Sequence, residues 1–403
     1  MKIIFLTQYY PPETGAPQSR LSFLAESMVR KGHSVTVLTG MPNYPTGRIF
    51  PGWGGFVRKE ERNGVRVLRS WIYPTQSTAT LPRLTNYFSF VFSSLAVGAF
   101  LLPRADYLLT ESPPLFLGIT GYLLSRLKRA RWIFNVSDLW PESAVRLKKI
   151  RAGSLGHRLA SRLEHFCYRK CWMVSGQARG IVSDIQKRFP EIRTFHLSNG
   201  VDARAFDPEK ANETSRRELG PESSCVAVYA GLHGLAQGLD QILDAAGAAP
   251  GSFRAIFFGD GPEKKALLEK SRHMGLRNVE FREGVSADKV PAYLASADFV
   301  LVPLAVDLPG AVPSKLYEGM ASGKPVLLVA AGEPAEIVRK YRCGIAVEPG
   351  DLAGLRAAIE ALCSDKEIRD SMGEAGRRAA MEHFNKETIS ERFAALLEEE
   401  LPL

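Results

Sequence analysis

Residues 297–330 of the 403-residue chain read ADFVLVPLAVDLPGAVPSKLYEGMASGKPVLLVA and contain a complete strand–loop–helix–strand pattern. The stretch opens with an apolar run rich in Val and Leu, which is typical of a buried strand. A loop with Gly and Pro follows, and Ser314 is expected to cap a helix that begins at Lys315. Gly323 is expected to end that helix, and the closing run KPVLLVA predicts a second strand, parallel to the first.

The same alternation of short apolar runs and helical patterns recurs along the chain. A helix is expected at 16–33, where Leu21, Leu24 and Met28 share one face. The other runs that predict strands are 2–7, 34–40, 64–72, 105–112, 131–138 and 171–176 in the first half, and 225–231, 253–261, 278–284 and 343–351 in the second. Strands that alternate with helices in this way are typical of parallel sheets.

Residues 197–224 interrupt this pattern, because Gly, Pro, Asn, Asp and Ser dominate there and the apolar period vanishes. They predict a domain linker. The expected fold is therefore α/β, with two facing Rossmann-like, doubly wound domains and a cleft between them, at 1–203 and 204–380. Residues 381–403 predict a C-terminal helix whose docking, back onto the N-terminal domain or elsewhere, stays open. In such sheets ligands bind beyond the carboxyl ends of the strands.

The composition is that of an ordinary globular chain, with 45% hydrophobic and 24% charged residues, and its length suits two domains. Five cysteines without regular spacing argue against a disulfide framework and favour a reducing, cytosolic setting. Cys167 and Cys171 lie one helical turn apart, but no second pair of ligands accompanies them, so no metal site is expected. The first apolar run is short and prolines follow it, so no signal peptide is expected.

The net charge is +9, and basic residues gather near the most apolar segment, 87–102. This segment falls short of the roughly 20 residues that span a bilayer, which leaves a buried core helix or a face that rests in the membrane interface. Residues 146–170 carry eight Lys and Arg against one Glu, and 125–131 add four more. Such basic segments suit an anionic membrane surface or nucleic acid, and a solvated helix face is the third alternative.

Polar residues follow two predicted strands of the N-terminal half. Gly15, after the first strand, lets the backbone of a helix start approach an anion. Asp138, at the end of the strand 131–138, is a candidate to take or hold the proton of an attacking hydroxyl, and the alternative is that it caps the next helix. The SNGVD sequence at 198–202 is interpreted as a plain tight turn.

Glycine-rich loops follow strands of the C-terminal half. Gly231, Gly234 and Gly238 lead into a helix and form a candidate phosphate cradle, although they do not make a G-x-G-x-x-G fingerprint. Residues 259–261 predict a second tight turn, with Pro262 at the start of a helix.

Lys315 and Glu318 are expected near the start of the helix that opened this section. Lys315 and the helix N-terminus can neutralise a diphosphate. Glu318, expected in the first turn, can bind two adjacent hydroxyls such as those of a ribose. The alternative is that Glu318 only offsets the helix dipole.

Together these residues resemble a known enzyme family. The sequences PSKLYEGMASGKPV, GDGPEKKAL, SNGVD and NVSDLWPES resemble the family 4 retaining glycosyltransferases of the GT-B fold. QYYPPETGAPQSR, GMPNYPTG, SDLWPES and AQGLD are similar to the bacterial branch that builds O-antigen and capsular polysaccharides and includes the N-acetyl-L-fucosamine transferase-like enzymes. The resemblance covers nearly the whole chain.

The resemblance implies transfer of a sugar, expected to be an N-acetylated amino sugar, from a UDP-sugar with retention at the anomeric carbon. The implied acceptor is a lipid-linked or nascent polysaccharide in O-antigen, capsule or exopolysaccharide biosynthesis. No metal and no cofactor besides the donor are implied, since positive groups and helix dipoles stabilise the departing diphosphate. The implied setting is cytoplasmic and peripheral, with the N-terminal acceptor domain facing an anionic inner membrane surface and the C-terminal domain holding the donor. No nucleic-acid partner is expected.

The resemblance also implies roles for single residues. Glu318 matches the second glutamate of an E-x7-E motif and would bind the donor ribose, whereas the first glutamate falls on Gly310. The Arg and Lys that the family places against the diphosphate fall on Leu232 or His233 and on Gln237, so charge compensation passes to Lys315 and backbone amides. Gly259 to Glu263 would border the uracil. The expected catalytic groups are Asp138 and Lys315, the acceptor side has Asp138 and Glu142, and the donor side has Gly15, Gly231, Gly234, Gln237, Gly259, Asp260, Gly261, Ser314, Lys315, Leu316 and Glu318.

Two other functions fit parts of the pattern. A UDP-sugar 2-epimerase on the same fold would also hold UDP through a Glu and a helix N-terminus, but it needs no membrane-facing surface. A non-catalytic, membrane-associated scaffold of a polysaccharide assembly complex would keep the basic and apolar surface without needing Glu318. Nucleic-acid binding has only the basic charge in its favour.

Overall fold

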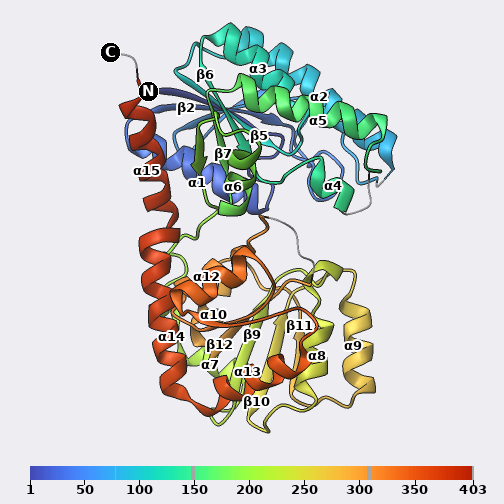
Figure 1. Cartoon of the computed structure of the whole chain (residues 1–403), viewed down its shortest axis with the longest axis vertical. Helices are drawn as coiled ribbons and strands as arrows, with labels where there is room; N and C mark the ends of the chain where they lie inside the picture. Colours follow the sequence, from blue (N-terminus) through green and yellow to red (C-terminus); the bar gives the residue numbers. More distant parts are fainter. Residues whose placement is uncertain (78, 147–149, 306–309, 402–403) are drawn as a thin grey trace. The chain divides into compact units, whose positions relative to one another are not determined.

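The computed structural model of the chain describes residues 1–77, 79–146, 150–305 and 310–401. It divides the chain into two compact units (Figure 1). Unit 1 comprises Met1–Asn199 together with Ile389–Leu403, and unit 2 comprises Gly200–Thr388. The first unit ends at Asn199, a few residues before the expected boundary at 203/204. Of the expected C-terminal helix 381–403, the part from Ile389 onward belongs to unit 1.

Unit 1 is built on a sheet that, in the described residues, has eight strands in the order β3-β4-β2-β1-β5-β6-β7-β8. The strands are β1 Lys2–Leu6, β2 Ser34–Gly40, β3 Val57–Arg62, β4 Val65–Ser70, β5 Tyr107–Ser112, β6 Arg131–Val136, β7 Met173–Gly176 and β8 Thr194–His196. The edge strand β3 runs antiparallel to β4, and the other neighbouring pairs are parallel.

Helices cover both faces of this sheet because its central strands are apolar on both faces. In β1, Ile3 and Phe5 join the core with α1 and α15, and the alternating Ile4 and Leu6 face the other side. On that side α2 and α3 lie next to each other over the strands (Figure 1). The helices of this unit are α1 Ala16–Arg30, α2 Thr80–Leu101, α3 Leu117–Lys128, α4 Glu142–Arg146, α5 Leu155–Lys170, α6 Arg179–Arg188 and α15 Lys386–Glu399.

The C-terminal helix α15 docks onto unit 1 through apolar side chains, a hydrogen bond and ion pairs, among them Lys31 with Glu391 and His33 with Glu398. Phe393 is fully buried, and its ring centroid lies 5.4 Å from that of Phe195. Tyr107 donates from its hydroxyl to the carbonyl of Leu397 at 2.8 Å. Beyond the helix, Glu400 pairs with Arg193 at 2.7 Å. The amphipathic pattern of the tail is therefore satisfied by the N-terminal unit.

Unit 2 has a six-stranded sheet in its described residues, in the order β11-β10-β9-β12-β13-β14, and all neighbouring pairs are parallel. The strands are β9 Cys225–Ala230, β10 Phe253–Phe258, β11 Val279–Arg282, β12 Phe299–Pro303, β13 Val326–Val329 and β14 Gly344–Val347. The helical segments are η1 Pro208–Lys210, α7 Glu213–Leu219, η2 Leu235–Gln237, α8 Asp240–Ala246, α9 Lys264–His273, α10 Val290–Ser296, α11 Ser314–Ala321, α12 Glu333–Tyr341, α13 Leu352–Ser364, α14 Lys366–Ala379 and the π-helix η3 Ala380–Phe384.

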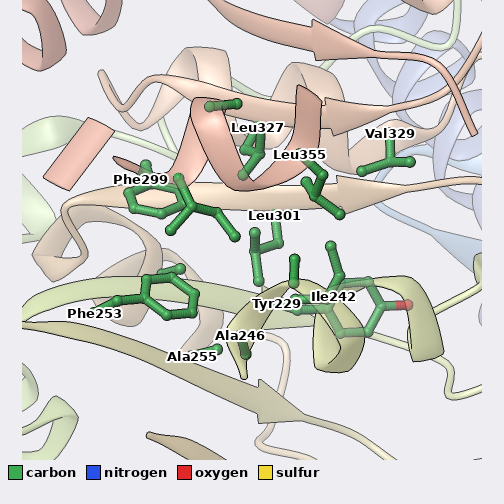
Figure 2. Packing of buried hydrophobic residues seen from close by; sticks show 14 of the residues in the cluster. Tyr229, Ile242, Ala246, Phe253, Ala255, Phe299, Leu301, Leu327, Val329 and Leu355 are labelled. Atoms are coloured by element: carbon green, nitrogen blue, oxygen red, sulfur yellow. The ribbon is translucent and has the colours of Figure 1, made fainter. Parts of the chain in front are cut away.

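The core of unit 2 lies between one face of this sheet and helices α8 and α13. Figure 2 shows Tyr229, Phe299 and Leu301 from the strands packed with Ile242 from α8 and Leu355 from α13. These side chains are almost completely buried. Both units therefore have the predicted Rossmann-like α/β architecture with parallel sheets.

Several expectations from the sequence are corrected. The segment 197–224 is not a plain linker, because α7 forms within it, with the side chain of Asn212 accepting from the amide of Ser215. The edge strands β3 and β8 were not predicted, since β3 reads VRKEER and is charged along its length. Residues 87–101 of the predicted apolar segment belong to a longer helix of 22 residues, and Leu102 follows it as the C-cap.

That longer helix, α2, is among the described residues the one long and apolar enough, by length and composition, to cross a membrane. It also packs on β2, β4 and α3, as a helix of an α/β core does. Its length and composition therefore leave both earlier interpretations open.

Candidate functional site

The strand order reverses once in each sheet, between β1 and β5 in unit 1 and between β9 and β12 in unit 2. In open parallel sheets the loops at such a reversal diverge above and below the sheet and leave a crevice at the carboxyl edge. In unit 2 these are the loop that follows β9 from Gly231 onward and the loop that leads from β12 to α11. Apart from Gly15, which lies in unit 1, the expected donor residues belong to the loop after β9, to the turn after β10 and to helix α11.

Gly231 and Lys315 meet directly at this reversal. A Cβ atom on Gly231 would lie 2.6 Å from the Nζ of Lys315, so a side chain here would displace the end of the lysine from its present position. The Nζ also lies 5.7 Å from the ring centroid of Tyr229. The Tyr229 hydroxyl donates to the carbonyl of Leu232 at 2.7 Å and so fixes the loop after β9. The loop and the start of α11 thus form one packed group.

Lys315 and Glu318 lie on α11 without pairing to each other. The Lys315 ammonium has neither an ion pair nor a hydrogen bond with any residue that the structure describes. Glu318 accepts a hydrogen bond from the Ser314 hydroxyl at 3.1 Å. Burial raises the pKa of Tyr229, and the negative charge of Glu318 raises it further. A cation and an anion are therefore both held half-buried on α11, three residues apart.

The structure corrects the expected start of this helix. α11 begins at Ser314 with Pro313 at the N-cap, and no side chain caps it. Ser314 therefore does not act as a helix cap, and its hydroxyl bonds to Glu318 instead. Because the helix begins earlier, Glu318 lies in the second turn and not in the first. The i, i+4 spacing of Ser314 and Glu318 explains this contact.

Leu316 and Gly310 are both buried, so neither residue is exposed to a ligand through a side chain. The Leu316 side chain is fully buried, and its amide donates to the carbonyl of Pro313 at 3.1 Å, so Leu316 belongs to the core of α11. Gly310 is buried, with a φ of 78° that favours glycine over the glutamate of the family motif. Residues 306–309 of the same predicted loop lie outside the described residues.

The turn after β10 packs tightly on the loop after β9. A Cβ on Gly259 would overlap the carbonyl oxygen of Gly231, and one on Gly261 would lie 2.8 Å from the amide nitrogen of His233. The amide of His233 donates to the carbonyl of Asp260 at 2.9 Å. The side chain of Asp260 is exposed and accepts from the amide of Gly261 at 2.8 Å. The glycines are needed for this close backbone approach.

The remaining expected residues of the first loop lie beside these glycines. Gly234 is buried, and a Cβ there would lie 2.7 Å from the Oε1 of Gln237. This Oε1 is buried and has no hydrogen-bond partner in the part of the chain that the structure describes. The predicted helix start at Pro262 is two residues early, since α9 begins at Lys264.

His233 is a residue whose position the sequence did not predict. It is fully buried, and its ring lies 5.9 Å from that of Tyr229 and 5.7 Å from that of Phe281. Neither ring nitrogen meets hydrogen-bond geometry with any described residue. Burial lowers the pKa of His233, and the nearby ammonium of Lys264 lowers it further. The neutral form of the His233 ring is therefore favoured between the loop after β9 and the turn after β10.

In unit 1, Asp138 lies two residues beyond the end of β6. Its Oδ2 accepts a hydrogen bond from the Ser143 hydroxyl at 2.8 Å, which ties it to the start of α4. Glu142 is exposed and lies 3.8 Å from the Nε of Arg146, its i+4 neighbour. The carboxylate of Glu142 thus turns to its own helix, and the basic segment continues into residues 147–149, which lie outside the described part of the chain.

Gly15 precedes α1 and is exposed. A Cβ there would lie 3.1 Å from the Cδ of Gln18, so the glycine leaves room for this side chain. Gly15, Asp138 and Glu142 all belong to unit 1, whereas the other expected site residues come together within unit 2.

A buried polar network at the carboxyl edge of the unit 1 sheet was missed by the sequence analysis. Arg20 and Glu111 are each 4% exposed, and their charged groups lie 2.7 Å apart. Arg20 also donates to the hydroxyl of Ser137 at 2.8 Å, to Asn199 at 2.7 Å and to Gln177 at 3.3 Å. The network thus joins α1 to the residue before Asp138 and to the predicted SNGVD turn. These partners are far apart in sequence, so no local pattern indicates them.

Two family models match the chain. Residues 15–200 match a model described as a glycosyl transferase 4-like domain, and residues 211–379 match one described as glycosyl transferases group 1. The chain is also similar to the glycosyl transferase WcaI of Escherichia coli (strain K12), which is assigned to colanic acid biosynthesis. The two are 27% identical over 374 residues, which cover 89% of this chain and 91% of WcaI.

Solved structures share the fold over nearly the whole chain. The sucrose-phosphate synthase of Thermosynechococcus elongatus has a TM-score of 0.77 at 18% identity and covers 99% of both chains. Anabaena HepE in complex with UDP has a TM-score of 0.72 at 20% identity, covering 99% of this chain and 100% of HepE. Both likenesses show the two-domain architecture.

Proposed function

Because the chain belongs to the GT-B glycosyltransferases of group 1 and the 4-like family, we propose that it transfers a sugar from a UDP-sugar to a lipid-linked or nascent polysaccharide. The transfer is proposed to retain the anomeric configuration and to move an N-acetylated amino sugar. The pathway is O-antigen, capsule or exopolysaccharide biosynthesis. The UDP complexes of HepE and the similarity to WcaI support the donor class and the pathway class.

The observation that carries this proposal is the ammonium of Lys315 beside Gly231 at the strand reversal of unit 2, which forms no ion pair with any residue that the structure describes. A diphosphate placed against Gly231 would meet this ammonium together with the N-terminus of α11. Glu318, next to it on the same helix, would accept from the two ribose hydroxyls. Ser314 would hold the Glu318 carboxylate in place.

In the reaction, the bond between the anomeric carbon and the β-phosphate oxygen breaks, and the electron pair leaves with UDP. A new bond forms between that carbon and the acceptor oxygen. The acceptor proton passes to the leaving phosphate, with Asp138 holding the acceptor hydroxyl. Lys315 and backbone amides compensate the charge that develops on the diphosphate, so we propose that no metal ion is required.

We further propose that unit 1 rests peripherally on the inner face of the cell membrane. Large apolar side chains are exposed on two of its helices, with Phe92 67% and Phe100 87% exposed on α2, and Leu155 73% exposed on α5. Basic residues such as Arg158 and Arg162 lie on the same side of α5 as Leu155 and are exposed. Apolar side chains flanked by cations suit the interface of an anionic bilayer.

A donor panel tests the transferase proposal. The full chain is incubated with a lipid-linked saccharide acceptor and each of several UDP- and GDP-sugars, and released nucleotide and product mass are measured. We expect UDP release with one UDP-sugar and a product heavier by that sugar. Glu318→Gln should reduce this release, and Glu269→Gln, an exposed glutamate of α9, serves as the matched control. Release of GDP alone would refute the donor assignment, and no release with any donor would refute the transferase proposal.

A further inference from the structure

A cavity of about 560 Å³ opens at the amino edge of the unit 1 sheet, away from the strand ends that carry the expected site. It is bordered by the starts of β1 and β5 and by the residues that follow α2 and α3. Its lining includes Lys2, Arg104, Lys128 and Arg129. Asp106 is the only acidic residue among the described residues that line it. The cavity is therefore strongly cationic.

Most of the basic side chains that line this cavity form no ion pair or hydrogen bond with a residue that the structure describes. Arg104 and Arg129 are exposed, and neither side chain has an ion pair or a hydrogen bond with a residue that the structure describes. Lys128 is the exception, since its ammonium donates to the carbonyl of Ala99 in the last turn of α2 at 2.8 Å. Asp106 accepts from the amide of Lys2 at 2.6 Å, so its carboxylate is engaged by the backbone. Two guanidinium groups remain available at the mouth of the cavity.

Exposed apolar side chains lie on the same two helices directly before these arginines. Phe100 is 87% exposed and Leu101 is 41% exposed at the end of α2. Leu127, at the end of α3, is 56% exposed. A soluble anion would contact only the arginines. A phospholipid would place its phosphate against the arginines and the start of its acyl chains against the exposed apolar side chains. The combination of charge and exposed apolar surface thus favours a lipid.

We propose that this cavity binds the phosphate of an anionic phospholipid headgroup, with Arg104 and Arg129 as its cationic contacts. Phe100 and Leu127 would rest at the acyl boundary beside it. The guanidinium groups suit this ligand because they can bind phosphate oxygens in pairs. The inference rests on the proposed membrane association of unit 1 and gives that association a defined lipid site.

Vesicle sedimentation at low salt tests the site. The full chain and the double variant Arg104→Gln with Arg129→Gln are mixed with neutral phosphatidylcholine vesicles or with vesicles that also contain phosphatidylglycerol. We expect about 25-fold weaker binding of the double variant to the anionic vesicles, since each Lys or Arg near such a surface contributes about fivefold. Arg272→Gln with Arg277→Gln is the matched control, because both arginines are exposed in unit 2 and have no described partner. This control should bind as the wild type does.

Other outcomes separate the site from the broader proposal. If Phe100→Ser with Leu127→Ser weakens vesicle binding but the arginine variant does not, the headgroup site is wrong and membrane association stands. If the wild type binds no vesicles, the headgroup site and the membrane association of unit 1 are both refuted. Inorganic phosphate added to lipid-free protein provides the third arm, and binding that matches the vesicles and is lost in the arginine variant would identify a soluble anion instead. UDP release from the donor should be unchanged in the arginine variant.

Discussion

Replacing Lys315 by methionine removes one positive charge from the start of α11 and keeps an unbranched side chain. In the structure the Lys315 ammonium lies 5.7 Å from the ring centroid of Tyr229 and has no ion pair in the described residues. The folded protein therefore loses only a cation–π contact, worth about 1 kcal/mol or less at a partly exposed site. Stability should be nearly unchanged, so a change in binding can be assigned to the ligand.

The expected loss of binding follows from the charge of the ligand. Two unit charges 4 Å apart interact by about 4 kcal/mol at an effective dielectric constant of 20. Desolvation of both groups reduces this to the roughly 1.5–3 kcal/mol found for hydrogen bonds between charged groups. Lys315→Met should therefore weaken UDP binding by about 10- to 150-fold.

Calorimetric titration of UDP into the full chain measures this loss. Lys324→Met is the matched control, because Lys324 is also a half-buried lysine of unit 2 but precedes β13 at the opposite edge of the sheet. The control should bind UDP within about twofold of the wild type. UDP affinity of Lys315→Met within the same twofold range would refute the assignment of Lys315 to the diphosphate.

Four further results are expected. Ser314→Ala should weaken UDP binding by a few-fold and less than Glu318→Gln does, since it removes only the hydrogen bond that orients the carboxylate; an equal effect would contradict this order. Arg20→Ala should lower the free energy of unfolding by about 3–5 kcal/mol in urea titrations, because it leaves the buried charge of Glu111 unpaired, and a loss below 1 kcal/mol would contradict it. Burial lowers the pKa of His196 to about 4, so between pH 6.5 and 4 the unfolded state binds more protons at this residue than the folded state does. The free energy of unfolding should therefore fall by up to about 3 kcal/mol as the pH drops from 6.5 to 4. His196→Gln should flatten this dependence, and an unchanged slope would show that other groups cause it. Excess EDTA should leave UDP release unchanged, and inhibition that Mg²⁺ reverses would overturn the metal-free mechanism.

Much of the fold could be predicted because the signals for parallel strands are local. The run SVTVLTG gives β2 Ser34–Gly40 with the predicted bounds, since branched apolar residues on both faces indicate a strand covered by helices. The charged edge strand β3 carries no such signal, because an edge strand needs little burial and gains its hydrogen bonds from β4. The helix α7 was also missed, since its seven residues bury only Ser215 and Leu219.

The candidate site could be predicted only in part. Gly231 and Lys315 were named because glycines and a lysine follow strands, but their contact depends on β9 and β12 lying side by side. The role of Ser314 as a cap was wrong, because Pro313 takes that position and the helix starts one residue earlier than expected. The burial of His233 and the Arg20–Glu111 pair were not predicted, since packing among residues distant in sequence decides both.

The sequence by itself determined the alternation of strands and helices, the two α/β blocks and the glycine-rich loops at strand ends, because apolar periodicity and turn residues act over a few positions. The tertiary structure decided which of these loops meet. Strand order places Gly231 beside Lys315. It also decided that Arg104 and Arg129 share one cavity at the ends of α2 and α3. Such long-range neighbours arise from burial of the whole sheet, which no short segment specifies.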